Sequence, residues 1–207
     1  MERSKRTTRR QPTKLPIMDA LRLPPPAALA FTICVDQREQ RPYDFGCMID
    51  KAAVPFAVRS GFLQSGDYSV DPAAGAAEEY ETSRDPRDGI AIERKSLQDL
   101  YSTLGSHRDR FEAEWERLSR YGHALVVIEA ELSQIKEPNK FLNHPTNLNP
   151  KSVINTLLAW QLRYGVHWVA CPGRGFAEQL TFRVLEKWVK EKARKAAMVQ
   201  VQREGVA

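Results

Sequence analysis

The stretch from Ile90 to Ser96 places three charged side chains in a row at the end of an apolar run. Its sequence, IAIERKS, is typical of a buried strand that turns directly into a helix. Side chains of a strand alternate between its two faces, so Glu93 and Lys95 share one face and Arg94 takes the other. Burying an unpaired charge is costly, and three together indicate a site that uses them. A carboxylate beside an amine suits a metal ion with a water or an oxyanion next to it.

Apolar runs of strand length recur along the chain, at residues 31–36, 55–63, 66–70, 90–94, 124–129 and 166–170. Helical periodicity and start signals predict helices at residues 96–105, 107–121, 149–163 and 176–195, with a polar loop over residues 131–149. Strands that alternate with helices in the second half indicate a mixed sheet with helices on its faces. The predicted fold class is therefore α/β.

The length of 207 residues favours one domain, and we expect a basic, Pro/Ala-rich disordered tail over 1–30, a folded body over 31–195 and a C-terminal tail over 196–207. The net charge of +5 lies in residues 1–14, because the other 25 basic and 25 acidic side chains cancel. Such a tail can hold nucleic acid by counterion release, and a solvated terminus explains it equally well. Residues 71–89 are rich in small, charged and turn-forming side chains, which predicts a long, mobile hairpin connection.

The three cysteines lie far apart in the sequence and have no C-x-x-C spacing. We interpret them as reduced thiols of a cytoplasmic protein without a zinc site. No stretch is long enough for a membrane helix. Residues 15–31 are interrupted by charges and prolines, which excludes an ordinary signal peptide. We therefore expect no membrane association, and we expect no nucleotide cofactor.

Acidic residues stand at the ends of several expected strands. Asp36 and Glu39 follow the first strand, Asp67 precedes the third, and Glu93 ends the fourth. Strands that terminate at one edge of a sheet bring such acids together. Mg²⁺ takes carboxylate oxygens, keeps several waters and usually binds beside phosphate. A cation between the acids would explain their clustering, and Lys95 would then position or deprotonate the attacking water, or offset charge in the transition state.

These residues resemble the signature of a known family. The segments Val35–Glu39, Gly66–Tyr68 and Glu93–Asp99 are similar to the V-D-x-R-E, G-D and E-R-K-x-x-x-D motifs of the XPF-type nuclease domain. That domain is a branch of the restriction-endonuclease-like (PD-D/E-x-K) superfamily, whose fold is a mixed central sheet flanked by helices. The similarity spans residues 31–195, and residues 160–183 further resemble short, stand-alone members from bacteria and phages.

The resemblance implies metal-dependent hydrolysis of DNA phosphodiesters, with Mg²⁺ as the cofactor and Mn²⁺ able to substitute. Asp67 and Glu93 would be the primary metal ligands, and Asp36 and Glu39 would complete or support the metal shell. Lys95 would be the catalytic lysine. The implied setting is DNA repair, recombination or phage DNA processing in the cytoplasm of a bacterial or phage-infected cell.

Arg94 would organise the site or the scissile phosphate, and Arg38 would support it. Asp99 matches the last position of the third motif, but helix capping explains it equally well. Arg108 and Arg110 of the helix over 107–121 could contact phosphate, and a solvated face is an equal alternative. A homodimer is expected from the resemblance alone.

Larger eukaryotic and archaeal relatives carry a helix-hairpin-helix module after the nuclease domain. We expect none here, so their preference for branched DNA is not carried over. Two alternatives to a DNA endonuclease stay open. One is a catalytically inactive DNA-binding scaffold, against which the intact Asp67, Glu93 and Lys95 argue. The other is a nuclease that acts on RNA, or a resolvase-like enzyme with the same site.

Overall fold

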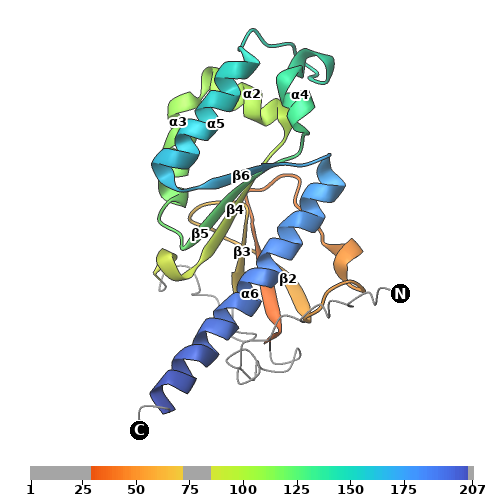
Figure 1. Ribbon diagram of the computed structural model, residues 1–207. Helices are drawn as coiled ribbons and strands as arrows, with labels where there is room; N and C mark the ends of the chain where they lie inside the picture. The colour runs from red at the N-terminus through yellow and green to blue at the C-terminus, as the bar shows by residue number, and fades with distance from the viewer. Residues whose placement is uncertain (1–28, 72–84, 205–207) are drawn as a thin grey trace, which may run out of the picture.

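The structure is a computed structural model that describes residues 29–71 and 85–204, without the side chains of residues 200, 201 and 204 (Figure 1). The expected basic tail therefore lies outside the described residues, apart from Leu29 and Ala30. Most of the expected hairpin connection over 71–89 also lies outside them.

One mixed sheet of six strands forms the centre of the fold, in the order β2-β1-β3-β4-β5-β6. Its strands are β1 (Phe31–Asp36), β2 (Phe56–Gly61), β3 (Tyr68–Asp71), β4 (Ile90–Lys95), β5 (His123–Ile128) and β6 (His167–Ala170). Strand β3 is antiparallel to both of its neighbours, whereas the β1–β2, β4–β5 and β5–β6 pairs are parallel. This arrangement confirms the predicted α/β class with a mixed central sheet.

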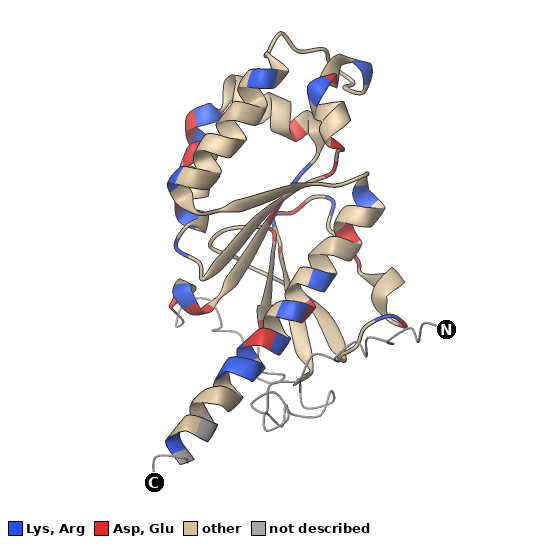
Figure 2. Cartoon of the chain, in the orientation of Figure 1, with Lys and Arg blue, Asp and Glu red and all other residues tan. Residues whose placement is uncertain are grey.

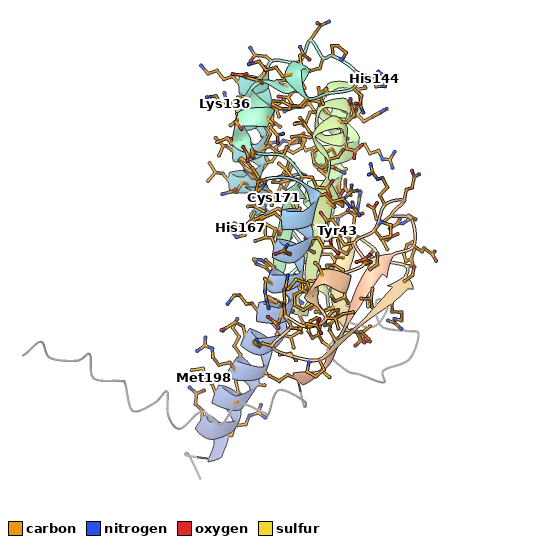
Figure 3. The ribbon with its side chains drawn as sticks, turned by 90° about the vertical axis from the view of Figure 1, so that its right-hand side faces the viewer. Tyr43, Lys136, His144, His167, Cys171 and Met198 are labelled. Atoms are coloured by element: carbon orange, nitrogen blue, oxygen red, sulfur yellow. The ribbon has the colours of Figure 1, made fainter. Side chains whose placement is uncertain are left out.

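Helices cover both faces of the sheet. They are α2 (Leu97–Ser106), α3 (Arg108–Leu118), α4 (Leu132–Lys136), α5 (Pro150–Tyr164) and α6 (Arg174–Glu204), with short 3-10 segments η2 (Gly46–Met48), η3 (Pro86–Asp88) and η4 (Pro138–Lys140). Helices α2, α3 and α5 lie together on one side and α6 crosses the other (Figure 1). The C-terminal part of α6, which carries Met198, extends away from the sheet (Figure 3).

Strand β4 separates two hydrophobic clusters because its side chains alternate. Ile90 and Ile92 pack in the cluster that includes α6, whereas Ala91 packs in the cluster of α2, α3 and α5. The same alternation carries on into the charged end of the strand, so Glu93 and Lys95 belong to the side of α3. The sheet thereby assigns the charges to two different layers.

Capping side chains fix where the helices beside the site begin. The Ser96 hydroxyl accepts a hydrogen bond from the backbone N–H of Asp99 at 3.1 Å, which starts α2 immediately after β4. Asn149 caps α5 in the same way, with Pro150 at the first helical position. Both starts confirm the sequence-based expectation.

Several boundaries differ from the sequence-based expectation. The predicted polar loop over 131–149 contains α4 and η4, because Glu131 and Gln134 form a capping box and Ile135 is fully buried. A single buried side chain within α4 leaves no helical periodicity to detect. Helix α6 continues past residue 195, to Glu204. Within the described ranges, no helix is long and apolar enough to cross a membrane.

Candidate active site

A cavity of about 420 Å³ opens between the ends of the central strands and the α2–α3 pair. Its lining contains Asp36, Arg38, Glu39, Asp67, Glu93, Lys95, Asp99 and Arg110 among the predicted site residues, together with Thr103, His107, Phe111, Glu114 and Arg117. Figure 2 shows that the strands carry few charged residues away from this region. The chain thus brings together acids that lie up to 78 positions apart in the sequence, from Asp36 to Glu114.

Glu93 and Lys95 meet on the cleft face of β4, as their spacing predicted. Lys95 Nζ lies 2.5 Å from Glu93 Oε1 and 3.7 Å from Glu114 Oε2, and 4.9 Å from the centre of the Phe111 ring. Burial disfavours the charged amine, but the attraction of Glu93 and Glu114 outweighs burial and raises the pKa of Lys95. Lys95 is therefore held as an ammonium ion.

Asp67 stands beside this pair at the start of β3. The backbone N–H of Arg94 donates to Asp67 Oδ2 at 2.7 Å, and the N–H of Asp67 donates to the carbonyl of Ile92 at 2.8 Å. Burial raises the pKa of Asp67 to about 7, against the lowering effect of the Arg94 hydrogen bond. Burial and the neighbouring Asp67 carboxylate also raise the pKa of Glu93. These two acids share a poorly solvated space in which a cation would relieve their repulsion.

Gly66 permits the close approach of this turn to β4. Its φ of +78° is rarely adopted by residues with a Cβ. A Cβ at this position would lie 3.1 Å from the carbonyl oxygen and 3.2 Å from the nitrogen of Ile92. The Gly-Asp pair therefore places Asp67 against β4 for a steric reason.

Asp36 has both of its carboxylate oxygens occupied by protein donors. Oδ1 accepts from Arg38 N and Nε at 2.7 and 2.8 Å, and Oδ2 accepts from Arg38 Nη2 at 2.6 Å and Leu63 N at 3.0 Å. Burial raises the pKa of Asp36, but these hydrogen bonds outweigh it and bring the pKa below its usual value. Asp36 and Arg38 together fix the turn that forms one wall of the cleft.

Arg94 lies on the opposite face of β4 from the cleft. Its Nε and Nη2 donate to the two carboxylate oxygens of Glu129 at 2.8 and 2.9 Å, and its Nη1 lies 3.3 Å from Glu39 Oε1. Glu129 also accepts from the Tyr43 hydroxyl at 2.9 Å and from Arg174 at 3.3 Å. Figure 3 places Tyr43 beside the N-terminal part of α6. Arg94 therefore organises the support of the site, and it does not line the cavity.

Two acids of this region, Glu129 and Glu114, were not predicted from the sequence as site residues. Glu129 follows the apolar run of β5 as Glu93 follows that of β4, and this parallel was the available signal. Glu114 lies three residues after the buried Phe111 on α3, so it reaches the cleft at the edge of that helix's apolar face. Without the packing of α3 on the sheet, nothing marks Glu114 among the other acids of α3.

The structure separates the two arginines predicted to bind nucleic acid. Arg110 lines the cleft. Arg108 does not, because it donates to Thr156 Oγ1 at 3.0 Å and lies 5.2 Å from the Trp160 ring, in the contact between α3 and α5. Asp99 lines the cleft and also caps α2 with Ser96, so both explanations of this residue fit its position.

The acids of the cleft differ in how far their oxygens are free to hold a metal ion. Among the described residues, no group of three or more His, Cys, Asp or Glu side chains is arranged to enclose a metal. Asp67 Oδ1 and Glu93 Oε2, however, accept no hydrogen bond from any residue within 29–71 or 85–204. Two carboxylates with open oxygens fit Mg²⁺, which binds through one or two carboxylates plus waters and phosphate rather than in a closed protein cage.

A mixed sheet with flanking helices, together with a cleft that joins the carboxylates of Asp67 and Glu93 to Lys95, is the arrangement of a restriction-endonuclease-like fold. The family model of the ERCC4 domain matches residues 35–181, which is more than half of the chain. The chain therefore belongs to the ERCC4 domain family.

The structure is also similar to the solved structure of XPF from Aeropyrum pernix, with a TM-score of 0.51 and 19% sequence identity. The match covers 83% of this chain and 69% of that one, and it supports the shared fold. No curated protein matches the sequence.

Proposed function

We propose that the protein is a Mg²⁺-dependent endonuclease that hydrolyses phosphodiester bonds of DNA. The observation that carries the proposal is the convergence of Asp67, Glu93 and Lys95 in one cleft, with an open oxygen on each carboxylate. The XPF named in the structural match and the ERCC4 domain family favour DNA as the substrate. Work in DNA repair, recombination or phage DNA processing, a cytoplasmic location and a homodimer stay predictions.

Asp67 and Glu93 would hold the metal, and Mn²⁺ would serve in place of Mg²⁺. When bound, the ion would polarise the scissile phosphate and lower the pKa of a coordinated water. Lys95, already an ammonium ion between Glu93 and Glu114, is suited to offset the negative charge that develops on the phosphate. Its raised pKa disfavours the role of a base that deprotonates water.

Asp36 is proposed to position the cleft wall, because its four hydrogen bonds leave its oxygens little freedom for a metal. Glu39 lines the cavity while its Oε1 lies 3.3 Å from Arg94. We infer that Glu39 supports the metal shell from this position and links the cleft to the Arg94–Glu129 pair.

The test is a cleavage assay with labelled single-stranded, duplex, flapped and junction DNA, and with RNA, in Mg²⁺, Mn²⁺ or EDTA. Glu93→Gln and Lys95→Ala are compared with Glu116→Gln, an exposed acid of α3 outside the cavity. Loss of one electrostatic stabiliser should lower the rate about 10²–10³-fold, and Glu116→Gln should behave as wild type.

Cleavage that persists in EDTA, or in both cleft variants, would overturn the proposal. DNA binding without cleavage of any substrate would favour the inactive scaffold instead. Cleavage confined to RNA would reassign the substrate and keep the chemistry.

A further inference from the structure

Two arginines of α3 line the cleft without joining the ion pairs that hold it together. Arg110 and Arg117 are exposed at the cavity. Among the described residues, neither side chain has a hydrogen-bond or ion-pair partner, in contrast to Arg108 and to Arg163, which lies 2.5 Å from Glu112. Their guanidinium groups are thus available to a ligand in the cleft.

The two arginines flank the reacting centre along one face of α3. Arg110, Glu114 and Arg117 have the spacing i, i+4 and i+7, which puts them in one row of the helix surface. At 1.5 Å per residue, Arg110 lies about 6 Å before Glu114 along the axis, and Arg117 about 4.5 Å after it. Because Glu114 approaches Lys95 to 3.7 Å, the arginines stand one turn to either side of the catalytic pair.

The acidic character of the cleft explains why free cations at Arg110 and Arg117 would matter for a ligand. Six carboxylates and four basic side chains line the cavity, and the basic residues other than the two arginines are already paired with acids: Arg38 with Asp36, and Lys95 with Glu93. A polyanion that enters this acidic space needs further cations at the wall. The planar guanidinium fork suits phosphate oxygens better than the point charge of a lysine does.

We propose that Arg110 and Arg117 bind the phosphates on the two sides of the scissile phosphate, so that the substrate strand runs along α3 through the cleft. This inference rests on the proposed function and names its substrate-binding track. It also assigns Arg108, on the side of α3 that faces α5, to the packing of the fold.

The experiment measures binding of single-stranded and duplex oligonucleotides by fluorescence anisotropy in EDTA, over a series of NaCl concentrations. The variants are Arg110→Gln, Arg117→Gln and the double change, and glutamine keeps the helix propensity close to that of arginine. Arg120→Gln is the matched control, since Arg120 is exposed just beyond α3 and does not line the cavity. Circular dichroism checks that each variant is folded.

Each lost phosphate contact should reduce the slope of log K against log salt by about 0.7 on single strands or about 0.9 on duplex. The double variant should lose about 1.4 or about 1.8, while Arg120→Gln keeps the wild-type slope. In the cleavage assay, the double variant should raise KM more than it lowers kcat.

A double variant with wild-type affinity and slope would overturn the proposed track, as would an equal loss in Arg120→Gln. The proposed function fails separately, by cleavage that persists in EDTA or in both Glu93→Gln and Lys95→Ala. Loss of cleavage in Glu93→Gln with an unchanged salt slope, together with the reduced slope of the double arginine variant, would support both, because the first change removes the chemistry and the second removes the phosphate contacts.

Discussion

The replacement of Glu129 by leucine tests how the site is supported. Glu129 and Arg94 expose only 8% and 6% of their side chains and are joined by two hydrogen bonds of 2.8 and 2.9 Å. The change would leave a buried guanidinium whose remaining carboxylate neighbour is Glu39, at 3.3 Å. The Tyr43 hydroxyl would also lose its acceptor.

Removal of one partner from a buried ion pair costs about 3–5 kcal/mol. The nearby Glu39 lessens the penalty for Arg94, whereas the unpaired Tyr43 hydroxyl adds to it, so we expect a loss of about 4 kcal/mol in the free energy of unfolding. At about 2–4 °C per kcal/mol for a domain of this size, the melting temperature should fall by about 8–16 °C.

Urea and thermal denaturation followed by circular dichroism measure the effect, with Glu116→Leu as the exposed control, expected within about 0.5 kcal/mol of wild type. The double variant Arg94→Met/Glu129→Leu should recover most of the loss, because an apolar pair leaves no buried charge unpaired. A Glu129→Leu protein within about 1 kcal/mol of wild type, or a double variant without recovery, would refute this reasoning.

Three further outcomes are expected. Gly66→Ala should lower the free energy of unfolding by about 1–3 kcal/mol, because Gly66 has a positive φ and a Cβ there would press against Ile92. Gly105→Ala, inside α2 with open space around it, should raise the free energy of unfolding by about 0.5–1 kcal/mol. Urea denaturation distinguishes the two signs. In EDTA, the Asp67 carboxyl has a pKa of about 7 in the folded protein and an ordinary aspartate pKa of about 4 in the unfolded chain. Between these two pH values the folded protein therefore binds more protons than the unfolded chain. Stability should therefore fall as pH rises through this window, and Asp67→Asn should weaken the dependence; an unchanged pH profile would contradict the assignment. Mg²⁺ at 100 times its dissociation constant should stabilise the wild type by about 2.7 kcal/mol and have a much smaller effect on Glu93→Gln, as measured by thermal shift.

Local signals in the sequence predicted most of the sheet and the cleft face of β4. Alternation within IAIERK was sufficient to place Glu93 and Lys95 together, because the period of a strand is fixed by its backbone geometry. The starts of α2 and α5 were also predictable, since Ser96 and Asn149 cap the helix that follows them directly in the chain. Such features depend on residues a few positions apart.

Features that depend on long-range packing could not be predicted. The Arg94–Glu129 pair requires the parallel pairing of β4 with β5, in which Lys95 lies opposite Ile128. The role of Glu114 requires the packing of α3 above the strand ends. One of the four hydrogen bonds of Asp36 comes from Leu63, 27 positions away, in the turn after β2. None of these relations leaves a periodic trace in the sequence.

The alternation of side chains along β4 also separates the proposed catalytic residues from a residue that supports the fold. Glu93 and Lys95 face the cleft, whereas Arg94, between them, joins the layer of α6 through Glu129 and Arg174. Under the proposed function, a single change at either cleft residue would therefore abolish cleavage while the fold persists. A change at Arg94 puts the architecture itself at risk. Three consecutive residues of one strand thus differ in the effect of their mutation, and under the proposed function one substitution on the cleft face would leave a protein that binds DNA without cleaving it.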